Sequence, residues 1–369
     1  MKFLIAPNAF KGTFTALEAV SMLEKILGQE YPGATYSSQP VADGGDGTCE
    51  LLITSLGLEK VSCNSLNAVG RPILGFYGWE APTKTAYLDV STCSGIAGLK
   101  LEERDPRLAS TFGTGLLIQD AVKRGARQLV LGLGGSATVD VGAGILQALG
   151  FLFLDAQGRE IAAFSPDFLK RCKHIQRPLK LPAISFSLLC DVKNPFFGLN
   201  GAVRVFGPQK GIKEDELEAM EFITSDFVKL LARKSKGLWM DQEGFGAAGG
   251  IALGLNQFFP CKLEFGAPYF FEKVGMAEKV AAADWMITGE GRYDSQSEAG
   301  KACYELLKLA RKEGKKIALI ASGKEGQNSG FDAVLELPAL DFSQADYKNK
   351  AQEKIQGLFK EALLKGKFF

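Results

Sequence analysis

Segments rich in glycine, acidic residues or both follow the predicted strands of this chain, and they constrain its fold more than any other feature. Five of them occur, at residues 42–48, 132–140, 190–195, 246–250 and 288–294. Glycine lets backbone amides approach an anion closely, and ligands of open α/β sheets bind beyond the carboxyl ends of the strands. Any one segment is explained as well by a tight turn with solvated acids. The five together predict an α/β protein with anion-binding loops.

The two ends of the chain share the order strand, loop, helix, strand. Near the amino terminus we expect strands at 2–7 and 36–41, separated by a helix that begins at a capping box formed by Thr15 and Glu18. Near the carboxyl terminus, apolar spacing predicts a helix at 302–313 with strands on either side. Repeats of this kind form parallel sheets.

This order predicts two domains, of which the first is discontinuous in sequence and the second is inserted into it. The first is a Rossmann-like parallel sheet domain built from both chain ends, residues 1–65 and 275–369. The middle of the chain, residues 66–274, contains hairpin turns between alternating strands and is predicted to form a second α/β domain inserted into the first.

Charge and cysteine content exclude several classes of protein. The 43 basic and 42 acidic side chains give a formal net charge of +1, so we expect no nucleic-acid partner. No apolar run approaches the ~18 residues of a membrane span, and the first residues do not resemble a secretory signal, so we expect no membrane association. The seven cysteines lack CxxC spacing, which is typical of thiols in a reducing compartment. We therefore predict a cytoplasmic protein.

The chain has a single histidine, His174, in a polar stretch that is typical of an exposed loop. We therefore do not expect Ser-His-Asp hydrolysis or a metal site with several histidine ligands. Acid–base chemistry is therefore expected from Asp, Glu or Lys.

Two further turns are candidates for binding anions. Residues 110–115 precede a helical run and could form a nest of backbone amides, and residues 207–211 present Lys210 on a stiff turn where its ammonium could reach a phosphate. Each is explained as well by a plain turn. Neither a Walker A sequence nor a protein-kinase signature occurs.

Taken in order, these motifs resemble the type-1 glycerate kinase family, and the similarity covers almost the whole chain from Ile5–Gly12 onward. Its most specific elements are T-G-E-G-R-Y-D-S-Q-S at 288–297, followed by Gly300 and Lys301, and F-G-P-Q-K-G at 206–211. Two positions depart from the family pattern. Asn8-Ala9 stands where the family often has Asp-Ser, which excludes a catalytic carboxylate at position 8. Val139-Asp140-Val141-Gly142 stands where the family often has Asn-Asp-Gly-Gly.

The resemblance implies an enzyme that uses ATP and Mg²⁺ to phosphorylate D-glycerate, usually to 2-phosphoglycerate with release of ADP. It also implies a two-domain α/β fold with the active site in the cleft between the domains. We expect ATP and D-glycerate as its small-molecule partners, and a monomer or a homodimer.

Phosphoryl transfer mainly requires that the reactants be positioned and their charge neutralised. We expect the glycine-rich segments and one lysine to bind ATP, through Gly134, Gly135, Ser136, Lys210, Gly249 and Gly250. Backbone amides and an ammonium are suitable partners for phosphate oxygens.

Four acids are candidates for binding Mg²⁺ or accepting the glycerate hydroxyl proton. We assign Glu290 and Asp294 to the metal, and Asp43 and Asp191 to catalysis. Asp191 ends a predicted strand, which would aim its side chain rigidly, although it could instead only cap the following turn. The catalytic set is completed by two cations that motif position brings to the glycerate carboxylate, Lys11 and Arg292.

Two other functions remain open. Residues 132–137 fit the G-x-G-x-x-A fingerprint, and Asp155 lies where a ribose-binding acid would, as in an NAD(P)-dependent oxidoreductase. However, the residues at 139–144 prolong the loop where that fingerprint requires a helix. A two-lobed small-molecule-binding protein without catalysis would also use glycine-rich loops, but acids beside them would repel an anionic ligand.

Overall fold

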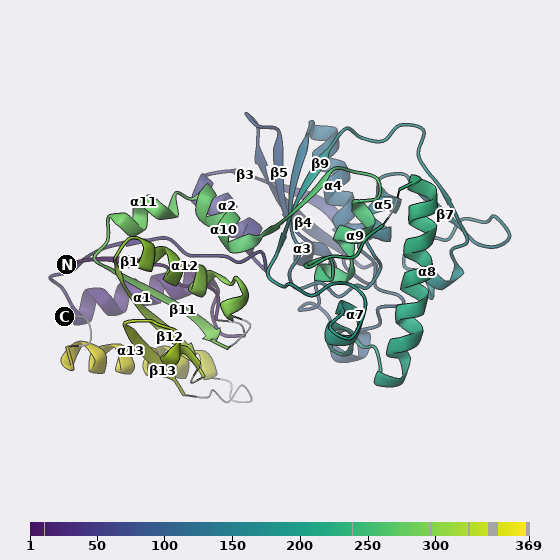
Figure 1. Ribbon diagram of the computed structural model, residues 1–369. Coiled ribbons are helices and arrows are strands. Elements are labelled where there is room, and N and C mark those ends of the chain that lie inside the picture. Colours follow the sequence, from purple (N-terminus) through teal and green to yellow (C-terminus); the bar gives the residue numbers. More distant parts are fainter. Residues whose placement is uncertain (11, 238, 295–296, 324, 339–345, 367–369) are drawn as a thin grey trace. The chain divides into compact units, whose positions relative to one another are not determined.

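The computed structural model describes residues 1–10, 12–237, 239–294, 297–323, 325–338 and 346–366 (Figure 1). The chain divides into two compact units, the first made of Met1–Asp43 and Gly266–Phe369 and the second of Gly44–Phe265. We predicted boundaries at 65 and 275. The first differs because strand β3 (Glu59–Leu66) pairs along its whole length with β4 (Pro72–Glu80) of the second unit.

The first unit is built on a sheet whose described strand pairs are all parallel, in the order β13-β12-β11-β1-β2. Its strands are β1 (Lys2–Ile5), β2 (Thr35–Ser38), β11 (Trp285–Arg292), β12 (Lys316–Ser322) and β13 (Ala333–Leu337). Strands from both chain ends meet where β1 pairs with β11. The predicted Rossmann-like parallel sheet is confirmed.

Helices cover both faces of this sheet. Helices α1 (Ala16–Glu30) and α13 (Tyr347–Leu364) share one apolar core with alternate residues of β1 and β11, such as Ile5 and Ile287. Helix α12 (Ala302–Lys312) contacts β11 and β12, and it also contacts α10 (Gly266–Lys273) and α11 (Met276–Ala281). A parallel strand buried on both faces explains the nearly continuous apolar run of β12.

Helix α1 begins at the predicted capping box. The amide of Glu18 donates to Thr15 Oγ1 over 3.1 Å, and the amide of Thr15 donates to Glu18 Oε2 over 2.7 Å. These two bonds satisfy amides that the first turn of a helix otherwise leaves without partners.

The second unit contains a mixed sheet in the order β10-β9-β6-β5-β4-β3. Its remaining strands are β5 (Thr85–Asp89), β6 (Gln128–Gly132), β9 (Ser185–Cys190) and β10 (Cys261–Phe265). Strands β5, β6, β9 and β10 run parallel, whereas β3 and β4 pair antiparallel. A separate antiparallel pair joins β7 (Leu152–Leu154) to β8 (His174–Gln176). The predicted α/β class therefore holds for this unit as well.

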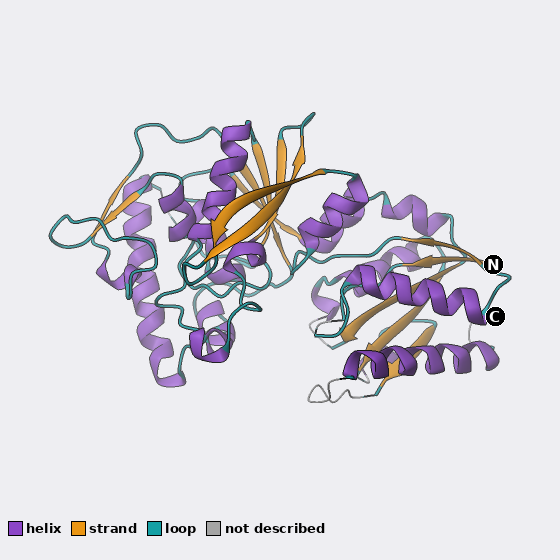
Figure 2. Ribbon diagram, turned by 180° about the vertical axis from the view of Figure 1, so that it is seen from behind, coloured by secondary structure: helices purple, strands orange, loops and turns teal. Residues whose placement is uncertain are grey.

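Helices pack around the strands of the second unit, as Figure 2 shows. They are α2 (Thr48–Leu56), α3 (Val90–Ser94), α4 (Phe112–Arg124), α5 (Ala143–Ala148), α6 (Phe168–Arg171), α7 (Ala202–Phe206), α8 (Leu217–Ser235) and α9 (Ile251–Leu255). Helix α2 contacts β4 and β5, and α4 contacts β3 and α5. Because β5, β6 and β9 are parallel neighbours, the loops after them leave from the same edge of the sheet.

Candidate functional site

In the first unit, the strand order reverses between β1 and β11, because α1 connects β1 to β2 on one side and α12 connects β11 to β12 on the other. Asn8 follows β1, and its backbone N–H donates to the carbonyl of Gly289 over 2.8 Å. The hydroxyl of Thr288 donates to the carbonyl of Ala6 over 2.8 Å. Ligands of α/β sheets bind at such a reversal, outside the carboxyl ends of the strands.

Glu290 lies in β11 at this reversal and is 6% exposed. Its Oε1 atom has no hydrogen-bond partner within the described part of the chain. Burial raises the pKa of Glu290 to about 7; the ammonium of Lys301 opposes this shift, and the carboxylates of Asp43 and Asp294 add to it. A buried oxygen without a partner is costly, so this carboxyl requires a proton or a cation.

Asp43 is buried and accepts a hydrogen bond from Asn8 Nδ2 over 3.0 Å. The other side-chain atom of that amide, Asn8 Oδ1, accepts from the backbone N–H of Ala9 over 2.8 Å. Asparagine at position 8 therefore supplies a donor to the Asp43 carboxylate. An aspartate there would place a second acceptor within hydrogen-bond distance of the first.

The remaining predicted residues of the first unit lie at or just beyond the end of β11. Arg292 ends the strand and is exposed, and Asp294 is half-buried two residues later. Lys11 lies outside the described residues. Across the described parts of the chain, no three His, Cys, Asp or Glu side chains are already arranged around a common metal position.

In the second unit, the carboxyl ends of β5, β6 and β9 lie side by side. Asp89 at the end of β5 pairs with Gly132 at the end of β6, which pairs in turn with Leu189 of β9. Asp191 is the residue that follows β9, and it is half-buried. The adjacent strand ends therefore bring the 132–136 segment next to an acid on either side.

The glycines of the 132–136 segment permit close contact with the 44–46 segment. A Cβ on Gly134 would lie 2.3 Å from the Cα of Gly45, and a Cβ on Gly135, whose φ is +67°, would lie 1.7 Å from Asp46 Oδ1. The amide of Gly134 is already used, since it donates to the carbonyl of Gly44 over 3.2 Å. Contact with the backbone of Gly45 accounts for Gly134, and contact with the Asp46 side chain together with a positive φ accounts for Gly135.

The segment at 246–250 packs on the same loop. A Cβ on Gly249 would lie 2.0 Å from the carbonyl oxygen of Thr138, and one on Gly250 would lie 2.7 Å from the ring of Phe196. The amide of Val141 donates to the carbonyl of Gly249 over 3.0 Å. These glycines allow two loops distant in sequence to lie in contact.

Lys210 joins this group from a single 3-10 turn, Pro208–Lys210. It is 5% exposed, and its Nζ donates to Ser136 Oγ over 2.9 Å and to the carbonyl of Thr138 over 2.8 Å. Burial lowers the pKa of Lys210 to about 8, and the carboxylate of Asp140 opposes that shift. The structure thus brings the lysine into direct contact with the glycine-rich loop.

Asp140 is bonded to Thr111, in the turn at 110–115 where the sequence suggested an amide nest, and to two amides of its own loop. Its Oδ2 accepts from the amide and hydroxyl of Thr111, over 2.8 and 2.7 Å, and from the amide of Gly144 over 3.2 Å; its Oδ1 accepts from the amide of Gly142 over 3.1 Å. Burial raises the pKa of Asp140 while these bonds lower it. These donors therefore bind an anion of the protein itself and join the 132–144 loop to Thr111.

One acid that we did not predict, Asp89, lies at the same strand ends. Asp89 is 3% exposed; its Oδ2 accepts from the amide of Cys49 over 2.7 Å, and its Oδ1 has no partner among the described residues. Burial raises the pKa of Asp89 well above its usual range, and the carboxylates of Asp46 and Glu50 add to this. The sequence signal for Asp89 was an acid at the end of an apolar strand. We selected acids in or beside glycine-rich segments, and no glycine follows Asp89 until Gly95.

The fold and the candidate site together are those of an α/β enzyme. Both units carry acids and glycine-rich turns at the carboxyl ends of parallel strands, which is where α/β enzymes bind their ligands. No helix among the described residues is long and apolar enough to cross a membrane.

Comparison with known proteins identifies the family. The model of the glycerate kinase family matches residues 3–363. Glycerate kinase of Bacillus subtilis is 36% identical over 84% of this chain and 82% of its own, and glycerate 2-kinase of Escherichia coli is 35% identical over 91% and 90%. A crystal structure assigned to glycerate kinase 2 of Salmonella typhimurium LT2 covers both chains fully, with a TM-score of 0.82 and 31% identity.

The chain belongs to the glycerate kinase family. It is therefore an enzyme of the phosphotransferase class, which confirms the resemblance and decides against the oxidoreductase and the binding protein without catalysis. The loop geometry agrees, because α5 begins only at Ala143, well after the G-x-G-x-x-A segment in which a dinucleotide fingerprint requires a helix to start.

Proposed function

We propose that this chain catalyses the ATP-dependent phosphorylation of D-glycerate to 2-phosphoglycerate, with ADP as the second product. The observation that carries the proposal is its likeness to the glycerate 2-kinase of Escherichia coli, which extends over about nine tenths of both chains. The seven cysteines, all within the described residues, are free thiols, which supports the proposed cytoplasmic location. A monomer or a homodimer remains our expectation.

Lys210 and Ser136 are proposed to contact ATP phosphates. With a pKa of about 8, the Lys210 ammonium is mainly protonated at neutral pH, and its burial leaves it poorly screened by water. The Ser136 hydroxyl, which accepts from Lys210 Nζ, could donate its own proton to a phosphate oxygen. Gly135, Gly249 and Gly250 contribute by holding this loop, since their Cβ positions are filled by other parts of the protein.

Glu290 and Asp294 are proposed to hold Mg²⁺. The donor set fits this ion, because carboxylate oxygens are its preferred protein ligands and Glu290 Oε1 is buried without a partner among the described residues. When bound, the ion neutralises the charge of the phosphates during transfer. Asp43, held by the Asn8 amide, adds negative charge beside Glu290.

Asp191 is proposed as the general base. The C2 hydroxyl oxygen of glycerate forms the new bond to the γ-phosphorus, the bond from that phosphorus to ADP breaks, and the hydroxyl proton passes to the Asp191 carboxylate. Its position directly after β9 supports this role, since a strand end holds a side chain in one direction. Arg292 and Lys11 are proposed to pair with the glycerate carboxylate, and Asp43 to assist catalysis.

A coupled assay for ADP release, with D-glycerate or glycerol as acceptor, tests the activity. Glycerol lacks the carboxylate, and a lost charged hydrogen bond costs about 1.5–3 kcal/mol, so kcat/KM should fall roughly 10- to 100-fold. Phosphorus-31 NMR of the product distinguishes 2-phosphoglycerate from 3-phosphoglycerate. Equal kcat/KM for the two acceptors would refute glycerate as the substrate, and a 3-phosphate product would refute the proposed position of transfer.

A further inference from the structure

Two cavities in the second unit share a wall, and most of their lining residues have no part in the groups described so far. The inner one has a volume of about 30 Å³ and the outer one about 170 Å³. Both are lined by Pro106, Arg107, Asp167, Lys170, Met220 and Ile223. We call them together the α6–α8 pocket, because residues of both helices form its walls.

The α6–α8 pocket adjoins the loops that we assign to ATP phosphates. The inner cavity is bounded by Asp140, Ala143 and Gly144, which continue the loop whose Ser136 and Thr138 bind Lys210. The outer cavity is bounded by Gly211, the residue directly after Lys210. The pocket and the buried lysine therefore share the same two segments of chain.

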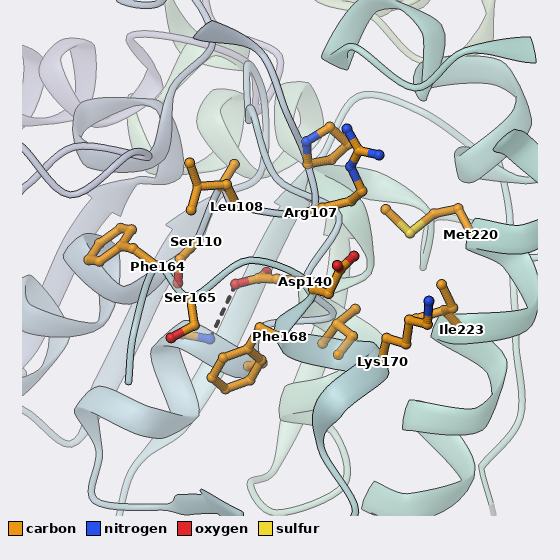
Figure 3. A pocket seen from close by; sticks show the side chains of 16 residues that line it. Arg107, Leu108, Ser110, Asp140, Phe164, Ser165, Phe168, Lys170, Met220 and Ile223 are labelled. Carbon is orange, nitrogen blue, oxygen red and sulfur yellow. Dashed lines mark hydrogen bonds between the residues drawn. The ribbon is translucent and has the colours of Figure 1, made fainter. Parts of the chain in front are cut away.

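The lining of the inner cavity is mainly apolar and partly aromatic. Figure 3 shows the side chains of Leu108, Phe164, Phe168, Met220 and Ile223 arranged around it. Flat aromatic ligands bury well against such side chains, because ring stacking and apolar contact require no exact polar partners.

Polar and charged groups also line the pocket, among them the acids Asp105, Asp140, Asp167 and Glu216. Ser110 is buried beside Asp140, and its Oγ accepts from the amide of Phe112 over 3.2 Å, which leaves its own hydroxyl proton to be donated. Arg107 is bound to Asp105 and Glu216. Lys170 is exposed at the wall shared by the two cavities. Asp105 and Glu216 are paired with Arg107, and Asp140 is bonded to backbone amides, so Ser110 and Lys170 are the groups left to contact the ribose and the phosphates of a nucleotide.

We propose that the α6–α8 pocket binds the adenine and ribose of ATP, an inference that rests on the proposed function. The base fits the outer cavity of about 170 Å³, whose apolar residues Ile212, Met220 and Ile223 would contact its ring. The nucleoside lies along α8, and the phosphates extend toward Lys210 and Ser136 on the shared loop.

Two neighbouring tryptophan substitutions on α8 test this. Ile223 is partly buried in both cavity walls, whereas Phe222 is 66% exposed and lines neither. Ile223→Trp should fill the cavity and raise both the KM for ATP and the Kd for ATP at least 10-fold. The KM for D-glycerate and the melting temperature should stay close to those of the unmodified protein. Phe222→Trp, the matched control, should change none of these values.

Ala219→Trp serves if Ile223→Trp lacks a cooperative melting transition. Ala219 lines the outer cavity but is exposed, so a larger side chain there is compatible with folding, and Glu218→Trp is its exposed neighbour control. Isothermal titration with ATP, without D-glycerate, separates this inference from the proposed function. If ATP affinity is unchanged in the pocket variants while glycerate is phosphorylated, the pocket assignment is wrong. If affinity falls in them but no glycerate is phosphorylated, the pocket stands and the proposed function fails.

Discussion

Glu290→Gln should make the protein more stable at alkaline pH and leave its stability unchanged at acid pH. The folded state raises the pKa of this carboxyl from 4.5 to about 7, chiefly by burial. Between these values the folded chain keeps a proton that the unfolded chain has released, so stability falls as pH rises through this window and is level above it. Glutamine carries no charge at any pH and removes that cost.

The size of the effect follows from the pKa. At about 1.4 kcal/mol for each pH unit, the displacement from 4.5 to about 7 corresponds to at most about 3 kcal/mol above pH 8. Glu290 is 6% exposed, so solvent screening removes little of this. Denaturant unfolding with EDTA present, at pH 4 and pH 8, measures the difference. Glu313→Gln, at an exposed position, is the control and should behave as the unmodified protein.

Addition of Mg²⁺ sharpens the same experiment. If Glu290 holds the ion, millimolar Mg²⁺ should recover much of the lost stability of the unmodified protein at pH 8, and it should have a smaller effect on Glu290→Gln. Identical pH profiles for the unmodified protein and Glu290→Gln would show that burial does not penalise this carboxylate, and the reasoning from the orphaned Oε1 atom would be wrong.

Three further variants test the second unit. Asp191→Asn should lower kcat ~100-fold or more, as expected for loss of a general base, with little change in melting temperature; early melting with retained turnover would instead make Asp191 a structural cap. Lys210→Met, which keeps length and burial but removes charge, should raise the KM for ATP more than 10-fold by loss of a charged contact of about 1.5–3 kcal/mol, and unchanged ATP kinetics would exclude Lys210 from the phosphate site. Gly135→Ala should destabilise the fold by about 1–3 kcal/mol in thermal unfolding, because of its positive φ and the contact with Asp46; an unaltered transition would mean that the loop adjusts freely.

Local patterns in the sequence were enough to predict the elements of the first unit. The capping box at Thr15 depends on residues three apart, and the strands of both chain ends depend on short apolar runs. The start of the second unit was harder to predict, because α2 and β3 follow the same strand and helix order as the first unit. Only their pairing and packing with β4 and β5 assign residues 44–65 to the other sheet, and such pairing is not visible in local periodicity.

The candidate site shows the same limit. Lys210 and the glycine-rich loop were both predicted to bind ATP, but the contact of Lys210 with Ser136 spans 74 residues of sequence, and only the fold defines it. Asp46 shares its segment with Asp43, and no sequence rule separates the acid that faces Asn8 from the acid that faces Gly135. Asp89 required knowledge that its strand is a buried neighbour of β6.

The carboxylate of Asp140 also has a consequence for crystallography and for protein design. It acts as a covalently attached counter-ion to the amides of Thr111, Gly142 and Gly144, so a sulfate from the crystallisation medium has no vacancy to fill there. Replacing Asp140 by glycine would open those amides to solvent and create a receptor for small oxyanions. The stability of that variant should then increase with sulfate concentration and not with chloride, because a bound sulfate would replace the missing carboxylate.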